Sequence, residues 1–166
     1  MSTKMTKLAL AIGAMVMVGG AMAADATGTA SATVINPITV SEARALAFGS
    51  VTASVTTAGT VALTAVDEAV KTDTTVSSTG TQQSGKFTVL GGDSNSYTIT
   101  VPATASLAST SSNDAADMTV TLTQSKTSGS LVAGTDAFFV GGSLAVAANQ
   151  NSGAYTGTYT VTVAYQ

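Results

Sequence analysis

The sequence contains no cysteine, no histidine and no tryptophan. Without cysteine there is no disulfide and no thiolate nucleophile, so the stability of the fold must come from burial and backbone pairing. Without histidine the chain lacks the usual general base at neutral pH and the commonest metal ligand. Most hydrolase mechanisms require a cysteine nucleophile or a histidine base, and this chain has neither. We therefore expect a protein that is not an enzyme and that binds no cofactor and no metal.

Charge is also scarce, since only 9% of the residues are Asp, Glu, Lys or Arg. Two of the six basic residues, Lys4 and Lys7, precede an apolar run over 8–18 and the small-residue pattern Ala21-Met22-Ala23. This order is typical of a cleaved signal peptide, which we predict over residues 1–23. The run is shorter than the ~20 residues that cross a bilayer. We expect a secreted protein with no membrane span after cleavage.

The remaining chain keeps four basic residues against nine carboxylates, a net charge of −5. The basic residues are Arg44, Lys71, Lys86 and Lys126, and they are scattered along the sequence. Nucleic-acid binding depends on clustered Lys and Arg that release counterions from the phosphates. We therefore expect no nucleic-acid partner.

Helical periodicity is missing as well, whereas Thr, Val and Ser alternate over short segments separated by Gly, Asn and Asp. This pattern predicts an all-β fold, a sandwich or a barrel. Pro37 should place the first strand at an edge or split it into two short pieces, and Gly141-Gly142 indicates a bulge or a hairpin. The small, polar segment 103–116 favours a surface loop or one helical turn. The predicted strands are 32–40, 45–55, 60–66, 86–90, 97–101, 118–123, 137–147 and 154–165.

Few residues suggest a chemical site. Asp67-Glu68 are adjacent, which on a strand points them to opposite faces, and a turn is the better interpretation. Asp93-Ser94-Asn95 resembles the start of a calcium loop but lacks its glycine and its distant glutamate, so a turn is favoured there too. Phe138-Phe139 would suit a carbohydrate-stacking platform, but core packing is the stronger interpretation because aromatic residues are scarce.

The last segment, 153–166, carries the strongest pattern. Apolar or aromatic residues alternate with Ala and Thr, so that one face suits a core and the other tolerates water. The strand either closes a complete sandwich or borders an unfinished groove that a neighbouring subunit fills. The residues that we predict to border such a groove are Gly153, Tyr155, Tyr159, Val161, Val163 and Tyr165.

This ending resembles chaperone-usher pilus subunits, which have a penultimate aromatic residue and a glycine fourteen residues from the carboxyl end. Tyr165 and Gly153 stand at those places. Most of the chain after residue 23 also resembles an uncharacterised family of secreted bacterial pilin-like β-domains. The segments that carry this second resemblance are Ala32-Thr33-Val34-Ile35-Asn36-Pro37-Ile38-Thr39-Val40, Phe48-Gly49, Lys86-Phe87-Thr88-Val89, Val140-Gly141-Gly142 and Gly153-Ala154-Tyr155-Thr156-Gly157.

The resemblance implies an immunoglobulin-like β-sandwich over 35–166 that is completed by a donor strand from another copy. The candidate donor is the amino-terminal extension 24–34, whose small residues alternate with Thr and Ser. It further implies a fibre subunit that meets a periplasmic chaperone and an outer-membrane usher in transit to the cell surface. The alternative is a complete, monomeric sandwich that binds a surface, a carbohydrate or a matrix component. The predicted donor residues are Ala26, Gly28, Ala30, Ala32 and Val34.

Overall fold

The computed structural model describes residues 23–110 and 116–166, so the predicted signal peptide over 1–23 lies outside the described residues except for Ala23. The chain divides into two units, residues 1–33 and residues 34–166. In the first unit, residues 23–33 are exposed and belong to no strand. The described ranges contain no helix long and apolar enough to cross a membrane.

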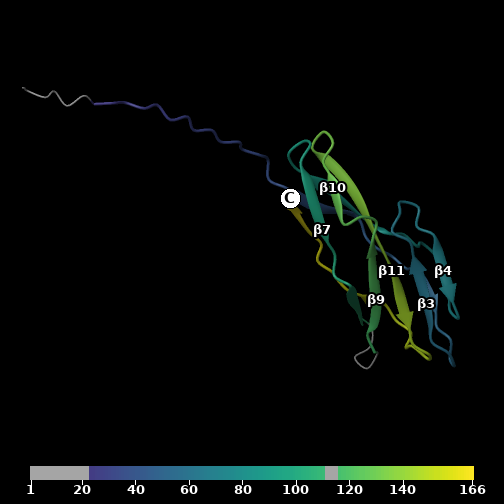
Figure 1. Ribbon diagram of the computed structural model, residues 1–166. Helices are drawn as coiled ribbons and strands as arrows, with labels where there is room; N and C mark the ends of the chain where they lie inside the picture. The colour runs from purple at the N-terminus through teal and green to yellow at the C-terminus, as the bar shows by residue number, and fades with distance from the viewer. Residues whose placement is uncertain (1–22, 111–115) are drawn as a thin grey trace, which may run out of the picture. The chain divides into compact units, whose positions relative to one another are not determined.

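The second unit is all-β, as predicted, and its described residues form thirteen strands and no helix (Figure 1). Every strand pair is antiparallel. The strands are β1 (Thr39–Arg44), β2 (Ser50–Thr52), β3 (Gly59–Leu63), β4 (Lys71–Thr74), β5 (Ser77–Thr79), β6 (Gly85–Leu90), β7 (Ser96–Thr100), β8 (Thr104–Ser109), β9 (Met118–Gln124), β10 (Ser128–Ser130), β11 (Thr135–Val146), β12 (Tyr155–Thr156) and β13 (Thr162–Tyr165).

The largest sheet curls into a half-barrel along the order β1-β6-β11-β9-β8-β12. Along one edge, the central strand β11 pairs first with β6 and then with β3. Its pairing with β6 ends at Val140, and its pairing with β3 begins at Gly142, while β9 lies along the other edge. Gly141 stands at the change, where a Cβ atom would lie 2.3 Å from the Leu63 carbonyl oxygen. The two glycines therefore allow β11 to exchange partners within one continuous strand, and the predicted bulge or hairpin is wrong.

A three-stranded sheet, β10-β7-β13, and the pair β2-β5 complete the domain. Tyr97 and Ile99 of β7 belong to the same buried cluster as Phe87 of β6 and Phe138 of β11. The Phe87 and Phe138 rings stack with their centroids 5.3 Å apart. Strand alternation explains this core, because successive side chains point to opposite faces. The buried interpretation of Phe138 is confirmed.

A hydrogen-bonded group ties the small sheet to β11. The fully buried Tyr97 donates its hydroxyl to Asp136 Oδ2 at 2.8 Å, and Lys126 Nζ lies 2.6 Å from the same oxygen. Burial alone would raise the pKa of Asp136, but the hydrogen bonds from Lys126 and Tyr97 outweigh it and hold that pKa below its ordinary value of 3.8. Asp136 is thus an ionised acceptor that fixes the buried tyrosine.

Several sequence predictions are corrected. The segment 103–116 is not a loop or a helical turn in its first half, since residues 104–109 form β8; residues 111–115 lie outside the described part. The predicted strand 32–40 begins only at Thr39, two residues after Pro37. The predicted terminal strand 154–165 is interrupted, because only β12 and β13 are paired. Asp93 lies in the turn between β6 and β7, as expected.

Candidate functional site

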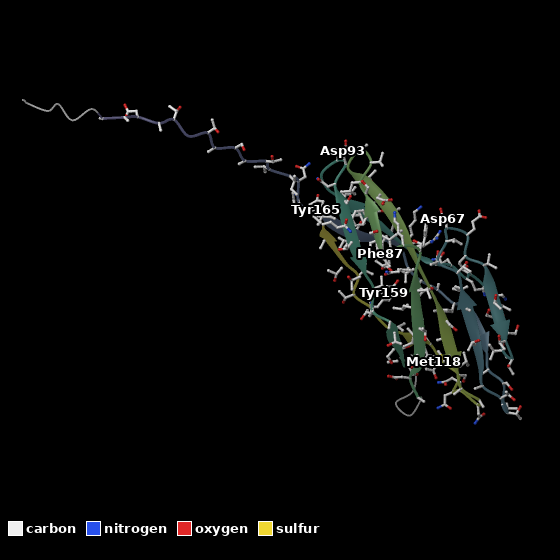
Figure 2. All side chains as sticks on the ribbon, in the orientation of Figure 1. Asp67, Phe87, Asp93, Met118, Tyr159 and Tyr165 are labelled. Carbon is white, nitrogen blue, oxygen red and sulfur yellow. The ribbon has the colours of Figure 1, made fainter. Side chains whose placement is uncertain are left out.

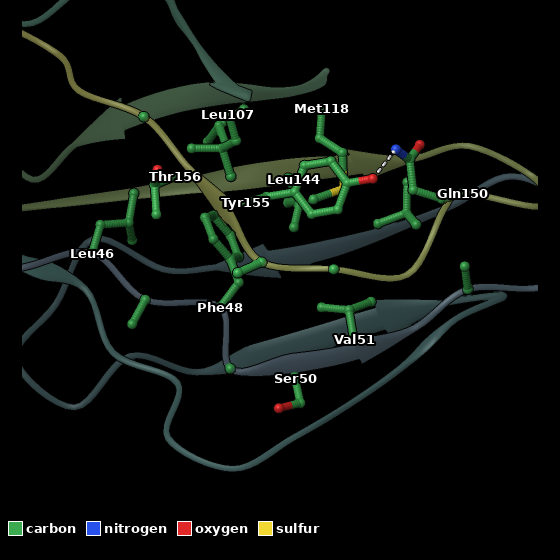
Figure 3. Close-up of a pocket in the computed structure, with 18 of the residues that line it drawn as sticks. Leu46, Phe48, Ser50, Val51, Leu107, Met118, Leu144, Gln150, Tyr155 and Thr156 are labelled. Atoms are coloured by element: carbon green, nitrogen blue, oxygen red, sulfur yellow. Dashed lines mark hydrogen bonds between the residues drawn. The ribbon is translucent and has the colours of Figure 1, made fainter. Parts of the chain in front are cut away.

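A groove of about 980 Å³ opens between the segment 46–53 and the segment 150–157 (Figure 3). Its inner wall is formed by apolar residues of β8, β9 and β11, most of which belong to the buried core. Val120 and Leu144, for example, are 1% and 2% exposed. The inner wall consists of Ala105, Leu107, Met118, Val120, Leu122, Leu144 and Val146.

The two segments that flank the groove run in opposite directions and meet beyond both of its ends. At one end the Asn149 amide donates to the Ser54 carbonyl oxygen at 2.7 Å. At the other end the Tyr165 hydroxyl donates to the Asn36 carbonyl oxygen, also at 2.7 Å. The chain on one side of the groove is thus hydrogen-bonded to the chain on the other side beyond each end of the groove.

The first flanking segment has one paired and one unpaired edge. Ala47 exchanges two hydrogen bonds with Gln83, each 2.9 Å long, and β2 pairs with β5. In an extended chain, neighbouring residues direct their main-chain groups to opposite edges. Leu46 and Phe48 therefore direct theirs toward the groove, where they have no hydrogen-bond partner in the described ranges.

The second flanking segment is unpaired over residues 157–161. β12 pairs with β8 before this stretch and β13 pairs with β7 after it. Among the described residues, the main chain of 157–161 finds no hydrogen-bond partner. Gly157 approaches β8 so closely that a Cβ atom would lie 2.0 Å from the Ser106 carbonyl oxygen. Glycine is thus required where this segment passes β8.

Aromatic rings stand inside the groove. Tyr155 donates its hydroxyl to the Asn151 carbonyl oxygen at 2.8 Å and accepts a hydrogen bond from Gln150 Nε2 at 2.9 Å. Gln150 Nε2 also donates to the Ala116 carbonyl oxygen at 2.7 Å. Figure 3 shows the Tyr155 ring among Phe48, Met118 and Leu144. Its hydrogen bonds to Asn151 and Gln150 hold the Tyr155 ring in position.

Tyr159 lies deeper, with its ring edge toward Phe87 at a centroid distance of 6.1 Å. Its hydroxyl is buried and has no hydrogen-bond partner in the part of the chain that the structure describes. Burial, with a smaller contribution from the Glu42 charge, raises the pKa of Tyr159 to about 12. The phenol is therefore neutral at physiological pH, and its hydroxyl lies against β6, 2.8 Å from where a Cβ atom at Gly85 would stand.

The other residues predicted at this site do not all line the groove. Gly153 lines the groove, whereas Val161 and Val163 pack against the core. Tyr165 pairs through β13 and accepts a hydrogen bond from the Gly92 amide at 2.7 Å. Figure 2 shows Tyr165 near the end of the domain that carries Asp93, and Met118 near the opposite end.

The predicted donor residues are not in any strand. Ala26, Gly28, Ala30, Ala32 and Val34 are all exposed, and Val34 has 94% of its surface accessible. A Cβ atom at Gly28 would meet nothing within 4 Å. The described part of the extension is therefore exposed and takes no part in strand pairing.

Sequence reasoning missed the opposite border, Leu46–Ala53. The apolar character of Leu46, Phe48 and Val51 was visible in the sequence, but the free edge depends on the distant pairing with Gln83 and β5. In the described ranges no group of three or more Asp, Glu, His or Cys residues is placed to hold a metal ion.

The comparisons with known proteins give one match. Residues 38–165 match the family model described as a domain of unknown function, DUF4402. No curated protein and no solved structure matches the chain. The match covers all thirteen strands.

Proposed function

The chain belongs to the DUF4402 family, and we propose that it is a structural subunit of a bacterial extracellular fibre. In this proposal the extension 24–34 of one subunit enters the groove of the next as an added β-strand. Main-chain hydrogen bonds supply affinity in such an arrangement, and the side chains that face inward supply specificity. A periplasmic chaperone and an outer-membrane usher are the proposed partners during export.

The observation that carries the proposal is a groove with unpaired main chain on both borders, around Leu46–Phe48 and over 157–161. Exposed sheet edges promote association with other chains, and proteins usually cover or charge them. Here the edges flank an apolar wall instead. A small molecule would cover that wall, but only an extended polypeptide satisfies both rows of main-chain groups.

The extension fits this gap in length and in pattern. Its eleven residues would span about 36 Å as a strand, at roughly 3.3 Å per residue. The groove-lining border from Gly153 to Tyr159 is seven residues long and spans about 23 Å by the same measure. Alternate positions of the extension carry Ala, Gly, Ala, Ala and Val, which supply a continuous apolar face.

A second copy is favoured over the same chain as the source of this strand. Val34 to Asn36 lie where Tyr165 holds the Asn36 carbonyl, at one end of the flanking segments. The near edge of the groove, at Tyr159, is six residues along the chain from Tyr165, or about 20 Å. More than half of the extension would be used to cover this distance within one molecule. A neighbouring subunit can use the whole extension for pairing.

The test compares the mature chain, residues 24–166, with a form that lacks 24–34. We expect the mature chain to form filaments visible by electron microscopy, and the shortened form to remain unassembled at the same concentration. Adding a peptide with the sequence 24–36 should raise the melting temperature of the shortened form. A mature chain that stays monomeric and melts at the same temperature as the shortened form would reject the proposal.

A second measurement addresses location. Antibodies against this chain should label filaments in material sheared from the surface of the producing cell. Labelling of a soluble monomer alone would favour the alternative, a secreted binding module.

A further inference from the structure

We infer that the groove accepts a strand only if its inward side chains are as small as glycine or alanine where it passes Phe48 and Tyr155. This inference rests on the proposed function and specifies which strands the groove can bind. It starts from a contrast between the two partners. The extension carries Ala26, Gly28 and Ala30 on one face, whereas the groove contains the rings of Phe48, Tyr155 and Tyr159.

The rings are fixed by the subunit that carries them. The Tyr155 hydroxyl is held by Asn151 and Gln150, and Gln150 is itself held by the Ala116 carbonyl oxygen. Phe48 is 8% exposed and precedes Gly49, whose φ of 73° places it in the left-handed region. A Cβ atom at Gly49 would lie 2.3 Å from the Thr79 carbonyl oxygen. The Tyr155 ring cannot swing out of the groove without breaking its hydrogen bonds, and the Phe48 ring is buried beside a backbone position that only glycine fits.

Fixed rings change what a passing strand can carry. Protein interiors are close-packed, so a larger side chain inserted against an immobile ring forces strained rotamers or backbone shifts. Small side chains let the incoming main chain approach both borders closely enough to form hydrogen bonds. The rings then supply the apolar volume that bulky donor side chains would otherwise supply. In this arrangement the large side chains belong to the groove and the small ones to the incoming strand, the reverse of a bulky strand in a groove lined by small residues.

Whether a single substitution strengthens or weakens strand insertion distinguishes this inference from general hydrophobic burial. Leucine in place of Ala30 adds apolar surface, which by itself would strengthen insertion. Steric exclusion by Phe48 and Tyr155 predicts the opposite. Ala30 and Gly28 are exposed and outside every strand in the free subunit, so changes there do not disturb its fold.

The experiment uses the mature chain with Gly28→Leu or Ala30→Leu, and Thr29→Leu as the control on the outward face. Assembly is measured by sedimentation over a dilution series. We expect each inward leucine to weaken subunit association by roughly tenfold or more, the range that overpacking produces. The Thr29 variant should assemble like the original chain. Inward leucines that assemble as well as the original, or better, would overturn the inference.

A compensating change in the groove provides a second readout. Tyr155→Ala combined with Ala30→Leu should recover assembly, whereas Tyr155→Phe, which keeps the ring, should not. Circular dichroism establishes whether each groove variant is folded. If Tyr155→Ala is unfolded, the Gly28→Leu and Ala30→Leu variants alone test the inference. Loss of the extension tests the proposed function separately. If its removal abolishes assembly while inward leucines strengthen assembly, strand insertion stands and the size rule fails.

Discussion

Replacing Ala30 by aspartate places a carboxylate on the face of the extension that we propose to enter the groove. The wall that it would meet is apolar and includes Leu107, Met118 and Leu122. Full burial raises a carboxyl pKa by about 3 units or more, and each unit corresponds to about 1.4 kcal/mol. The substitution should therefore cost about 4 kcal/mol of insertion free energy, or about a thousandfold in subunit affinity.

The matched control is Ser31→Asp, which adds the same charge one residue along, on the outward face. Both residues are exposed in the free subunit, so neither variant should change its melting temperature. Sedimentation velocity over a dilution series measures assembly for each. We expect Ala30→Asp to remain monomeric where Ser31→Asp assembles like the original chain. Equal loss in both variants, or loss in neither, would refute the reasoning that one face of the extension is buried.

Two predictions concern the subunit itself. Tyr97→Phe removes a hydrogen bond to the ionised Asp136, which should cost about 1.5–3 kcal/mol in urea unfolding at pH 7. Because the pKa of Asp136 is lowered, this contribution is present above pH 3.8 and is lost as the pH falls through the lowered pKa. The unfolding free energies of the variant and the original chain should therefore converge in acid. A constant difference between them down to pH 2 would contradict this. Gly157→Ala places a methyl against the Ser106 carbonyl oxygen and should lower the unfolding free energy by about 1–3 kcal/mol. Gly28→Ala, which meets nothing within 4 Å, is its control, and equal melting temperatures for the two would argue against the close approach at Gly157.

The strands with a clear apolar alternation were predictable from the sequence. Met118, Val120 and Leu122 share one face, and all three are buried in β9. Tyr97 and Ile99 behave in the same way in β7. In these segments the alternation reports burial directly, because one face of the strand packs against the core.

Strands with polar or small side chains were missed. β4 and β5 consist of Lys, Thr, Asp and Ser, and β8 carries Ala105 and Leu107 among Thr and Ser. β4 pairs with β3 and β8 pairs with β9, its neighbours along the chain, whereas β5 pairs with the more distant β2. Pairing leaves little trace in such polar segments, since strand propensity depends on tertiary context.

The candidate site was half visible in the sequence. The alternation from Tyr155 to Tyr165 is regular, yet the main chain of residues 157–161 has no hydrogen-bond partner among the described residues. A periodic pattern indicates which side chains face inward but not whether a neighbour is present to accept hydrogen bonds. The free edge at Leu46 and Phe48 depends on where Gln83 and β5 pair, which no local pattern specifies.

Amide hydrogen exchange at residues 157–161 tests strand donation most directly. These amides have no hydrogen-bond partner within the described residues of one subunit. In assembled mature protein we expect them to exchange slowly, and in the form lacking 24–34 we expect fast exchange, while the β9 amides stay protected in both. Addition of the 24–36 peptide should restore the protection. Fast exchange at 157–161 in the assembled protein, equal to that in the shortened form, would contradict the insertion of a strand at this edge.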